Sequence, residues 1–392
     1  KMQGSSAMRA CAILALALSA SALPTNVHNV NALSNAGNAR IAPNKNPGSL
    51  QPKSMGLRGG SGSALSSFIT FCDVQHLPIG ILIAIFVGLS NPDLGVKAGE
   101  NQFFATWSIP TIFFINGIKI KAEEAKKAVK NYKALGWGSL CILLLSAVIG
   151  CQLSKLAPLS IKEFITGIAV FSCLPSTTVS SPMLAAKAGG NFALALLLTL
   201  LVNVIAIFST PFLLKNLAGI SGGGFSVGGM IKRLATTSLT PLLVGKAVTS
   251  ASSTARDLAA YFSKVLTYIS SGVIIFQPWV AISRSTKRGV FSRVTGSEIF
   301  ILTVIVTIMH LLWQGIEYLG CVGLGLSLAS TKSVCIVGGA KNLPLALGLV
   351  GMLPATTGDT GLLVLPIVLG HFSTIVCDSI LGNYWSAKSD DR

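Results

Sequence analysis

Two long apolar stretches of the sequence are each interrupted by prolines and clustered polar residues. The interruptions are residues 173–182, with the sequence CLPSTTVSSP, and residues 338–344, with the sequence GGAKNLP. A proline inside a helix removes a backbone hydrogen bond, so each interruption leaves backbone N–H and C=O groups free. Together with hydroxyl side chains, such groups can replace the hydration water of a cation or a carboxylate. The pattern therefore predicts a binding site for a small solute or ion.

We expect side chains from both interruptions to contribute to this site. The candidate solute- and ion-binding residues are Thr177, Thr178, Ser180, Ser181, Lys341 and Asn342. The hydroxyl groups can instead bond to carbonyl oxygens of their own helix, four residues earlier. Because prolines stand on both sides of the hydroxyl cluster, the interpretation as ligands is favoured.

Lys341 is the most informative of these residues, because it lies deep inside an apolar stretch. A charge near the centre of a membrane helix costs about 2.5–3.5 kcal/mol on insertion scales, so it needs a partner or a water-filled cavity. Snorkelling of the side chain to the membrane surface is the alternative. We expect Lys341 to face the transport pathway.

Two further pairs of titratable residues are each spaced by seven positions: His310 with Glu317, and His371 with Asp378. This spacing places the members of a pair on one face of a helix. The candidates for proton coupling are Lys341, His310, Glu317 and His371. Structural polar pairs are the favoured explanation of the two spacings. No nucleophile elbow, H-E-x-x-H motif or Walker loop occurs in the sequence, so no catalytic residues and no enzyme are predicted.

The composition is that of a membrane protein. Of the 392 residues, 51% are hydrophobic and 11% are charged, against roughly 25% charged residues in an ordinary soluble domain. The mean hydropathy is +0.69, and apolar runs long enough to cross a bilayer recur along the chain. About ten spans are expected, at residues 77–95, 103–120, 134–154, 163–186, 191–214, 228–250, 261–282, 297–319, 328–352 and 361–385.

The charges of the loops indicate an internal repeat. Basic loops follow both the second and the seventh span, which lie on opposite sides of the membrane if there are ten spans. Two five-helix halves of inverted orientation produce such a balance. We predict an all-α membrane protein with a first repeat at residues 77–217, a Gly-rich linker at 218–229 and a second repeat at 228–386. Each interruption then falls in the fourth helix of its repeat, and matched broken helices mark the binding site of transporters.

The N-terminal segment contains no Asp or Glu up to residue 72. Residues 1–22 have the basic start, the apolar run and the small residues of a signal peptide, and residues 23–72 are transit-peptide-like or disordered. A bipartite leader predicts the plastid envelope, whereas a signal peptide with a disordered tail predicts a secretory-pathway or plasma membrane. The net charge of +17 comes from short loops and this leader, so no nucleic-acid partner is expected.

At the two interruptions the sequence resembles the bile acid:sodium symporter family, and more closely its sodium/bile acid cotransporter 7-like branch. The similarity extends over about residues 77–386. It is carried by residues 113–124 (FFINGIKIKAEE), 173–181 (CLPSTTVSS), 187–191 (KAGGN), 341–348 (KNLPLALG), Pro366 and His371. The resemblance implies a four-helix panel and a six-helix core, with the two broken helices crossing in the core near the sodium and substrate sites.

The resemblance also implies a set of sodium ligands. By position these are Ser180, Ser181 and Thr199. The sequence departs from the symporters at Val337 and Lys341, which stand where an acidic residue and a glutamine occur, and at Ala195, which replaces another hydroxyl ligand. Because a fixed ammonium supplies the positive charge of a bound sodium, we hypothesise that Lys341 takes the place of sodium and helps to hold an anionic solute. Release of its proton would instead couple transport to pH.

The expected function is secondary transport of a small organic anion across a lipid bilayer by alternating access. Na⁺ or H⁺ is the expected coupling ion, and no other cofactor is expected. The alternative is a non-transporting membrane regulator of calcium homeostasis, because relatives in this branch are linked to the control of cellular calcium.

Overall fold

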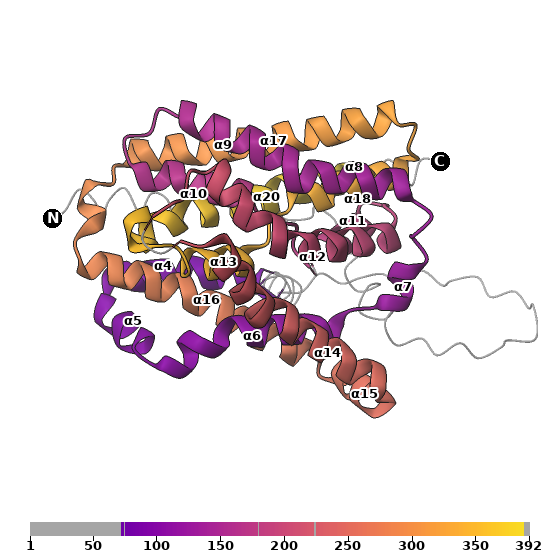
Figure 1. The fold of residues 1–392 in the computed structure, drawn as a ribbon, viewed down its shortest axis with the longest axis horizontal. Helices are drawn as coiled ribbons and strands as arrows, with labels where there is room; N and C mark the ends of the chain where they lie inside the picture. The colour runs from indigo at the N-terminus through magenta and orange to yellow at the C-terminus, as the bar shows by residue number, and fades with distance from the viewer. Residues whose placement is uncertain (1–71, 74, 179, 223–224, 388–392) are drawn as a thin grey trace, which may run out of the picture.

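The computed structural model describes residues 72–387, apart from residues 74, 179 and 223–224. The predicted leader segments lie outside the described residues, except for residue 72, as does part of the predicted Gly-rich linker. Helices joined by short loops make up the described chain (Figure 1). The prediction of an all-α membrane protein is confirmed in its helical class.

The helices follow one another along the whole described chain. Up to the Gly-rich linker they are α4 (His76–Ser90), α5 (Pro92–Gly99), α6 (Gln102–Lys119), α7 (Ala122–Lys126), α8 (Tyr132–Leu140), α9 (Ser146–Leu156), α10 (Lys162–Ser172), α11 (Ser180–Lys187) and α12 (Phe192–Asn216). After it they are α13 (Val227–Leu234), α14 (Thr240–Ala251), α15 (Ser253–Tyr261), α16 (Ser263–Lys287), α17 (Gly296–Gly323), α18 (Leu328–Gly339), α19 (Leu343–Val350) and α20 (Thr360–Ala387). The π-helical turns Cys141–Leu145 and Ala235–Leu239 join α8 to α9 and α13 to α14.

Several helices are long and apolar enough to cross a membrane. Within the described residues, five segments satisfy this by length and composition: Tyr132–Leu156, Phe192–Asn216, Ser263–Lys287, Gly296–Gly323 and Thr360–Ser386. A sixth is obtained if α4 and α5, which are bent by 107° at their junction, form one span. The chain is therefore a multi-pass membrane protein. The first predicted span, residues 77–95, begins with α4 but extends past its end at Ser90, where Asn91 and Pro92 interrupt the helix.

The two interruptions behave as expected from their prolines. Residues 163–186 form α10 and α11 with a non-helical segment between them, and residues 328–352 form α18 and α19. Asn342 begins α19 by accepting a hydrogen bond from Leu345 N through its side chain, at 3.1 Å. An asparagine cap followed by Pro344 restarts the helix after the break.

The helices form two groups (Figure 1). In the first group, α6 packs on α14, and α16 packs on α4, α5 and α6. In the second group, α10 packs on α9 and α20, α17 packs on α18 and α20, and α12 packs on α8, α11 and α18. The two groups meet mainly where α16 contacts α20 and α19 and where α6 contacts α19. The helix α13, which leads into α14 of the first group, also contacts α12 of the second.

Glycines allow the closest helix approach within the first group. A Cβ at Gly117 of α6 would lie 2.1 Å from the carbonyl oxygen of Leu242 on α14. In return, a Cβ at Gly245 of α14 would lie 2.3 Å from the carbonyl oxygen of Phe114 on α6. Small residues let helix backbones touch where side-chain burial from water gives no driving force, as in a membrane. The first group is thus held by tight backbone packing.

Candidate functional site

The two interrupted segments meet in space, although they are far apart in the sequence. Ser176 and Lys341 form an antiparallel β-bridge. Thr177 N donates to Ala340 O at 3.2 Å, and Asn342 N donates to Pro175 O at 2.8 Å. The backbone groups that each break leaves free are therefore satisfied by the other break. We call this meeting point, residues 174–178 and 340–342, the crossover.

Asparagine side chains connect the crossover to α12. Asn203 Nδ2 donates to Ser176 O at 2.7 Å and to Thr199 O at 2.8 Å. Its Oδ1 accepts from Asn342 Nδ2 at 2.8 Å. Asn203 was missed from the sequence, although an asparagine in the middle of an apolar helix is itself a signal, because an amide in a membrane needs a partner.

Lys341 is fully buried in the crossover, with 0% of its surface exposed. Its Nζ donates to Ser146 Oγ at 2.7 Å, to Leu174 O at 3.1 Å and to Ile142 O at 3.3 Å. The ammonium also lies 4.8 Å from the ring centroid of Trp313. Three oxygens and an aromatic face surround the charge, so the side chain does not snorkel, and in this conformation it is enclosed rather than open to a pathway.

A π-helical turn supplies one of these oxygens. Ile142 lies in the turn Cys141–Leu145, in which backbone hydrogen bonds skip to the fifth residue and leave a carbonyl without its usual partner. Ile142 O accepts from Ser146 Oγ at 2.7 Å as well as from Lys341. The irregular turn thus places one carbonyl oxygen where it accepts from both Ser146 Oγ and the Lys341 ammonium.

The predicted hydroxyl ligands lie at or near the crossover, but several are bonded locally. Ser181 Oγ donates to Thr177 O at 2.7 Å, and Thr199 Oγ1 donates to Ala195 O at 2.7 Å. The Thr199 bond lies within its own helix, as the alternative interpretation has it, and the Ser181 bond has the same four-residue spacing but reaches back from α11 into the break. Thr177 Oγ1 and Ser180 Oγ lie 2.8 Å apart, with Ser180 exposed and Thr177 buried. Thr178 is also buried, at 8% exposure.

The titratable residues pair across helices rather than along them. His310 Nε2 of α17 lies 3.0 Å from Asp378 Oδ1 of α20, and Gln314 Nε2 donates to the same oxygen at 2.5 Å. The expected pairing of His310 with Glu317, and of His371 with Asp378, is therefore wrong. A spacing of seven defines a shared face, but the partner comes from the helix that this face contacts.

Glu317 and His371 lie on the sides of the same buried region. The carboxylate of Glu317 packs on Gly338, because a Cβ there would lie 1.8 Å from Oε1. The His371 ring faces the backbone of Lys341. Each of the four titratable residues here has one buried side-chain atom without a hydrogen-bond partner in the described chain: Glu317 Oε2, His310 Nδ1, His371 Nδ1 and Asp378 Oδ2. Most buried polar atoms in proteins have a hydrogen-bond partner, so the region behind the crossover has an unusual concentration of buried polar atoms without one.

Comparison with known proteins gives the family. The sequence model of the SBF-like CPA transporter family matches residues 75–387. The chain belongs to this family. This SBF-like transporter resembles "Probable sodium/metabolite cotransporter BASS4, chloroplastic" of Arabidopsis thaliana, with 30% identity over 331 residues, 82% of this chain and 75% of the relative.

Two further relatives cover similar lengths. The BASS4 protein of Oryza sativa subsp. indica is 27% identical over 343 residues, 84% of this chain and 79% of the relative. "Sodium/bile acid cotransporter 7" of Rattus norvegicus is 24% identical over 309 residues, 77% of this chain and 90% of the relative. The resemblance inferred from the two interruptions is confirmed. The SBF-like transporter is a secondary transporter and not an enzyme.

Proposed function

We propose that this SBF-like transporter carries a small organic anion, and that the crossover is its ion and solute site. The pairing of Ser176 with Lys341 carries the proposal, because it brings both breaks and one positive charge to a single point. Paired breaks offer backbone and side-chain groups that can exchange partners when a solute enters. The candidate ligands around this point are Thr177, Thr178, Ser180, Ser181, Thr199 and Asn342.

The Lys341 ammonium is the resident cation of the proposed site. The ammonium donates to two carbonyl oxygens and one hydroxyl, which are the ligand types that a sodium ion takes. A lysine in that place gives the positive charge without an ion, so it can offset the charge of an anion. One elementary charge that crosses about 100 mV is worth about 2.3 kcal/mol, so such compensation matters for transport.

The names of the relatives support two finer proposals. The Arabidopsis relative is named a sodium/metabolite cotransporter and chloroplastic, and the rat relative a sodium/bile acid cotransporter. From these names we propose Na⁺ as the coupling ion; H⁺, which Lys341, His310, Glu317 and His371 would allow, is the alternative that applies if the Lys341 ammonium takes the place of sodium. The plastid envelope is the proposed location.

Alternating access would use the two helix groups as rigid bodies. The first group corresponds to the panel of the resemblance and the second group to its core, in a fold of ten spans arranged as two inverted five-helix repeats. The grouping of the helix contacts supports this division. Rocking of one group against the other would expose the crossover to each side in turn.

The decisive experiment is the thermal stability of the purified full chain in sodium chloride and in choline chloride, each with a panel of small organic acids. A ligand at about 100 times its dissociation constant adds roughly 2.7 kcal/mol of stability. Stabilisation by an acid only in sodium supports sodium symport. Stabilisation without sodium supports Lys341 as the resident cation. If none of the acids in the panel stabilises the protein, the proposal that it transports such acids is contradicted and the calcium-regulator alternative is favoured.

Two variants locate the effect at the crossover. Lys341→Gln removes the charge, and we expect it to abolish or weaken stabilisation by the acid. Lys332→Gln is the matched control, because Lys332 is another buried lysine, 4% exposed, which lies in α18 and whose Nζ donates to Trp385 O at 3.2 Å. If both variants respond to the acid like the natural chain, the solute does not bind at the crossover.

A further inference from the structure

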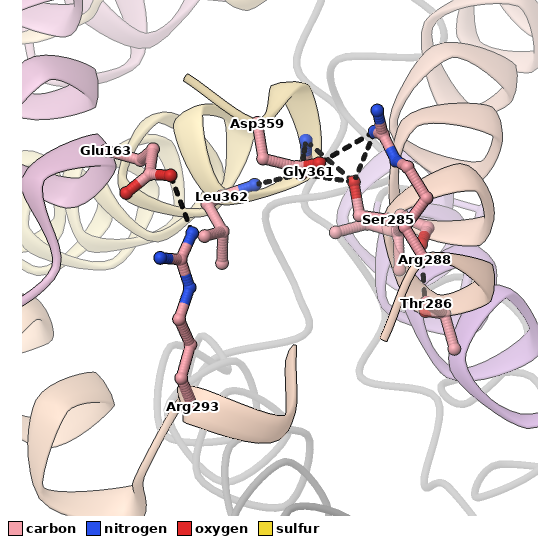
Figure 2. Close-up of polar contacts among 9 residues, drawn as sticks. Glu163, Ser285, Thr286, Arg288, Arg293, Asp359, Gly361 and Leu362 are labelled. Atoms are coloured by element: carbon pink, nitrogen blue, oxygen red, sulfur yellow. Dashed lines mark hydrogen bonds and ion pairs between the residues drawn. The ribbon is translucent and has the colours of Figure 1, made fainter. Parts of the chain in front are cut away.

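A polar cluster joins the end of α16 to the start of α20. Asp359 directly precedes α20, and its Oδ1 accepts from Gly361 N at 2.9 Å, as a helix cap does. The same oxygen accepts from Ser285 Oγ of α16, and Oδ2 lies 2.7 Å from Arg288 Nη2 (Figure 2). Asp359 therefore caps a helix of the second group while it holds the end of a helix of the first group.

A second ion pair lies at the same end of the molecule. Arg293, in the short turn Val290–Arg293 after α16, has its Nη2 2.7 Å from Glu163 Oε1 in the first turn of α10 (Figure 2). Both carboxylates are largely covered, with 9% of the Asp359 side chain and 13% of the Glu163 side chain exposed. The two arginines are about half exposed. Each pair thus joins a largely buried carboxylate to an arginine whose side chain can rotate into the solvent.

Next to Asp359, α20 of the second group and α16 of the first group are in very close contact. A Cβ at Gly361 would lie 2.3 Å from Ser285 Oγ and 3.1 Å from the carbonyl oxygen of Ala281. Gly361 N also donates to Ser285 Oγ at 3.1 Å. The interface between α16 and α20 is therefore closed at this end, and the ion pairs lie across the closure.

Other ion pairs near α16 stay within one group. Lys287 Nζ lies 2.8 Å from Asp93 Oδ1 of α5, and Lys264 Nζ lies 2.7 Å from Asp73 Oδ2, which precedes α4. Lys287 is the immediate neighbour of Arg288, yet its partner moves with α16, whereas the partner of Arg288 belongs to α20. Only the latter kind of pair opposes separation of the groups.

We propose that Arg288–Asp359, assisted by Arg293–Glu163, is an electrostatic latch that closes this end of the transporter and separates whenever the end opens. The proposal rests on alternating access between the two groups. A half-exposed ion pair contributes little, so it biases the equilibrium between conformations without trapping the protein in one of them. Asp359 keeps its capping bond to Gly361 after separation, so α20 stays intact while the contact with α16 is lost.

A reporter thiol between the groups tests the latch without any solute. Ile109 of α6 packs on Gly348 of α19, where a Cβ would lie 2.6 Å from Ile109 Cδ1. We would introduce Ile109→Cys into the full chain in lipid nanodiscs and measure its reaction with a membrane-impermeant methanethiosulfonate by peptide-resolved mass spectrometry, which separates it from the natural cysteines. Opening of the interface admits the reagent, so the labelling rate follows the open population.

Four variants on this reporter background distinguish the latch from general loosening. Arg288→Gln and Asp359→Asn are expected to raise the labelling rate by up to about fivefold, the shift that one such ion pair supports. Asn retains the capping oxygen, so Asp359→Asn removes the charge with the cap in place. Lys287→Gln, which removes an equal charge one residue away, is expected to leave the rate unchanged. Arg288→Lys should restore slow labelling.

Ionic strength supplies a second readout. Added choline chloride screens half-exposed pairs, so it should raise labelling in the Ile109→Cys chain but not in the chain that also carries Asp359→Asn. Unchanged labelling in both Arg288→Gln and Asp359→Asn would overturn the latch, as would an equal rise in Lys287→Gln. Neither result bears on solute binding, which is measured separately by the stability of the chain with organic acids.

Discussion

The carboxylate of Glu317 lies directly against Gly338, so close that a Cβ at this position would lie 1.8 Å from Oε1. One residue further, a Cβ at Gly339 would lie 2.5 Å from Cε1 of His310. The last two residues of α18 are therefore glycines, and the absence of their side chains leaves the space behind the crossover that Glu317 and His310 of α17 occupy.

We expect Gly338→Ala to destabilise the protein by about 1–3 kcal/mol, the usual cost of an overpacked core. The added methyl group would displace a buried carboxylate, and the neighbouring backbone of the crossover restricts how far it can move. Thermal unfolding in detergent measures the effect. Gly315→Ala on α17 is the control, because nothing lies within 4 Å of its Cβ position, and alanine there should be neutral or stabilising by up to about 1 kcal/mol. Equal stability of the two variants would contradict the packing argument.

Lys341→Ala is expected to convert the site of the ammonium into a site for sodium. The oxygens of Ile142, Ser146 and Leu174 would lose their common donor, and one unsatisfied buried group costs about 1–3 kcal/mol. Sodium should restore part of this stability and choline should not, because choline is too large for the space of an ammonium. Thermal unfolding in the two chloride salts gives the comparison. A natural chain that gains as much from sodium as the variant would show that the lysine does not occupy the cation position.

Asn203 and Asn342 are expected to act as one unit. Asn203→Ala, Asn342→Ala and the double variant form a cycle in which contacting residues show a coupling of about 0.5–3 kcal/mol. The loss should be strongest for Asn203, since it serves Ser176, Thr199 and Asn342 at once. Asn216→Ala at the exposed end of the same helix, where Nδ2 donates to Phe212 O at 2.9 Å, should change stability by less than about 0.5 kcal/mol. Strictly additive effects of the first two substitutions would refute the network.

Asp378 is expected to be the residue that holds the buried cluster of α17 and α20 together. Asp378→Leu would leave His310 Nε2 and Gln314 Nε2 without their acceptor, at about 1–3 kcal/mol for each unsatisfied group. Asp378→Asn keeps the shape and one acceptor oxygen, so its loss should be smaller. Adding His310→Leu to Asp378→Leu should recover part of the stability, because apolar groups then face each other. Chemical or thermal unfolding of the purified variants decides between these outcomes.

The helical class and the positions of the breaks follow from local sequence. Residues 173–182 and 338–344 contain prolines, glycines and hydroxyls inside apolar runs, and the structure breaks α10 from α11 and α18 from α19 at these places. The family resemblance was carried by these segments together with residues 113–124 and 187–191, Pro366 and His371. A helix break is a local property, because it depends on which backbone hydrogen bonds a residue and its near neighbours can form.

The partners within the site did not follow from the sequence. The seven-residue spacing correctly described shared helix faces, but it suggested pairs within α17 and within α20, whereas His310 bonds to Asp378 of the other helix. The contribution of Asn203 to the site could not be predicted from the sequence, because its side chain donates to the carbonyl oxygen of Ser176, 27 residues away. Contacts of this kind are set by which helices pack together, and periodicity along one helix carries no information on that choice.

The sequence by itself determined that this protein crosses a membrane, that its helices break at two places, and that a lysine stands at one of them. Apolar runs, prolines and a charge in an apolar stretch act through local backbone energy and transfer from water, both of which are properties of a segment. Only the tertiary structure decided that Lys341 is enclosed by oxygens of the turn Cys141–Leu145, of α9 and of the first break, and that Asp359 holds α16. Those outcomes depend on distant segments that packing brings to within hydrogen-bond distance.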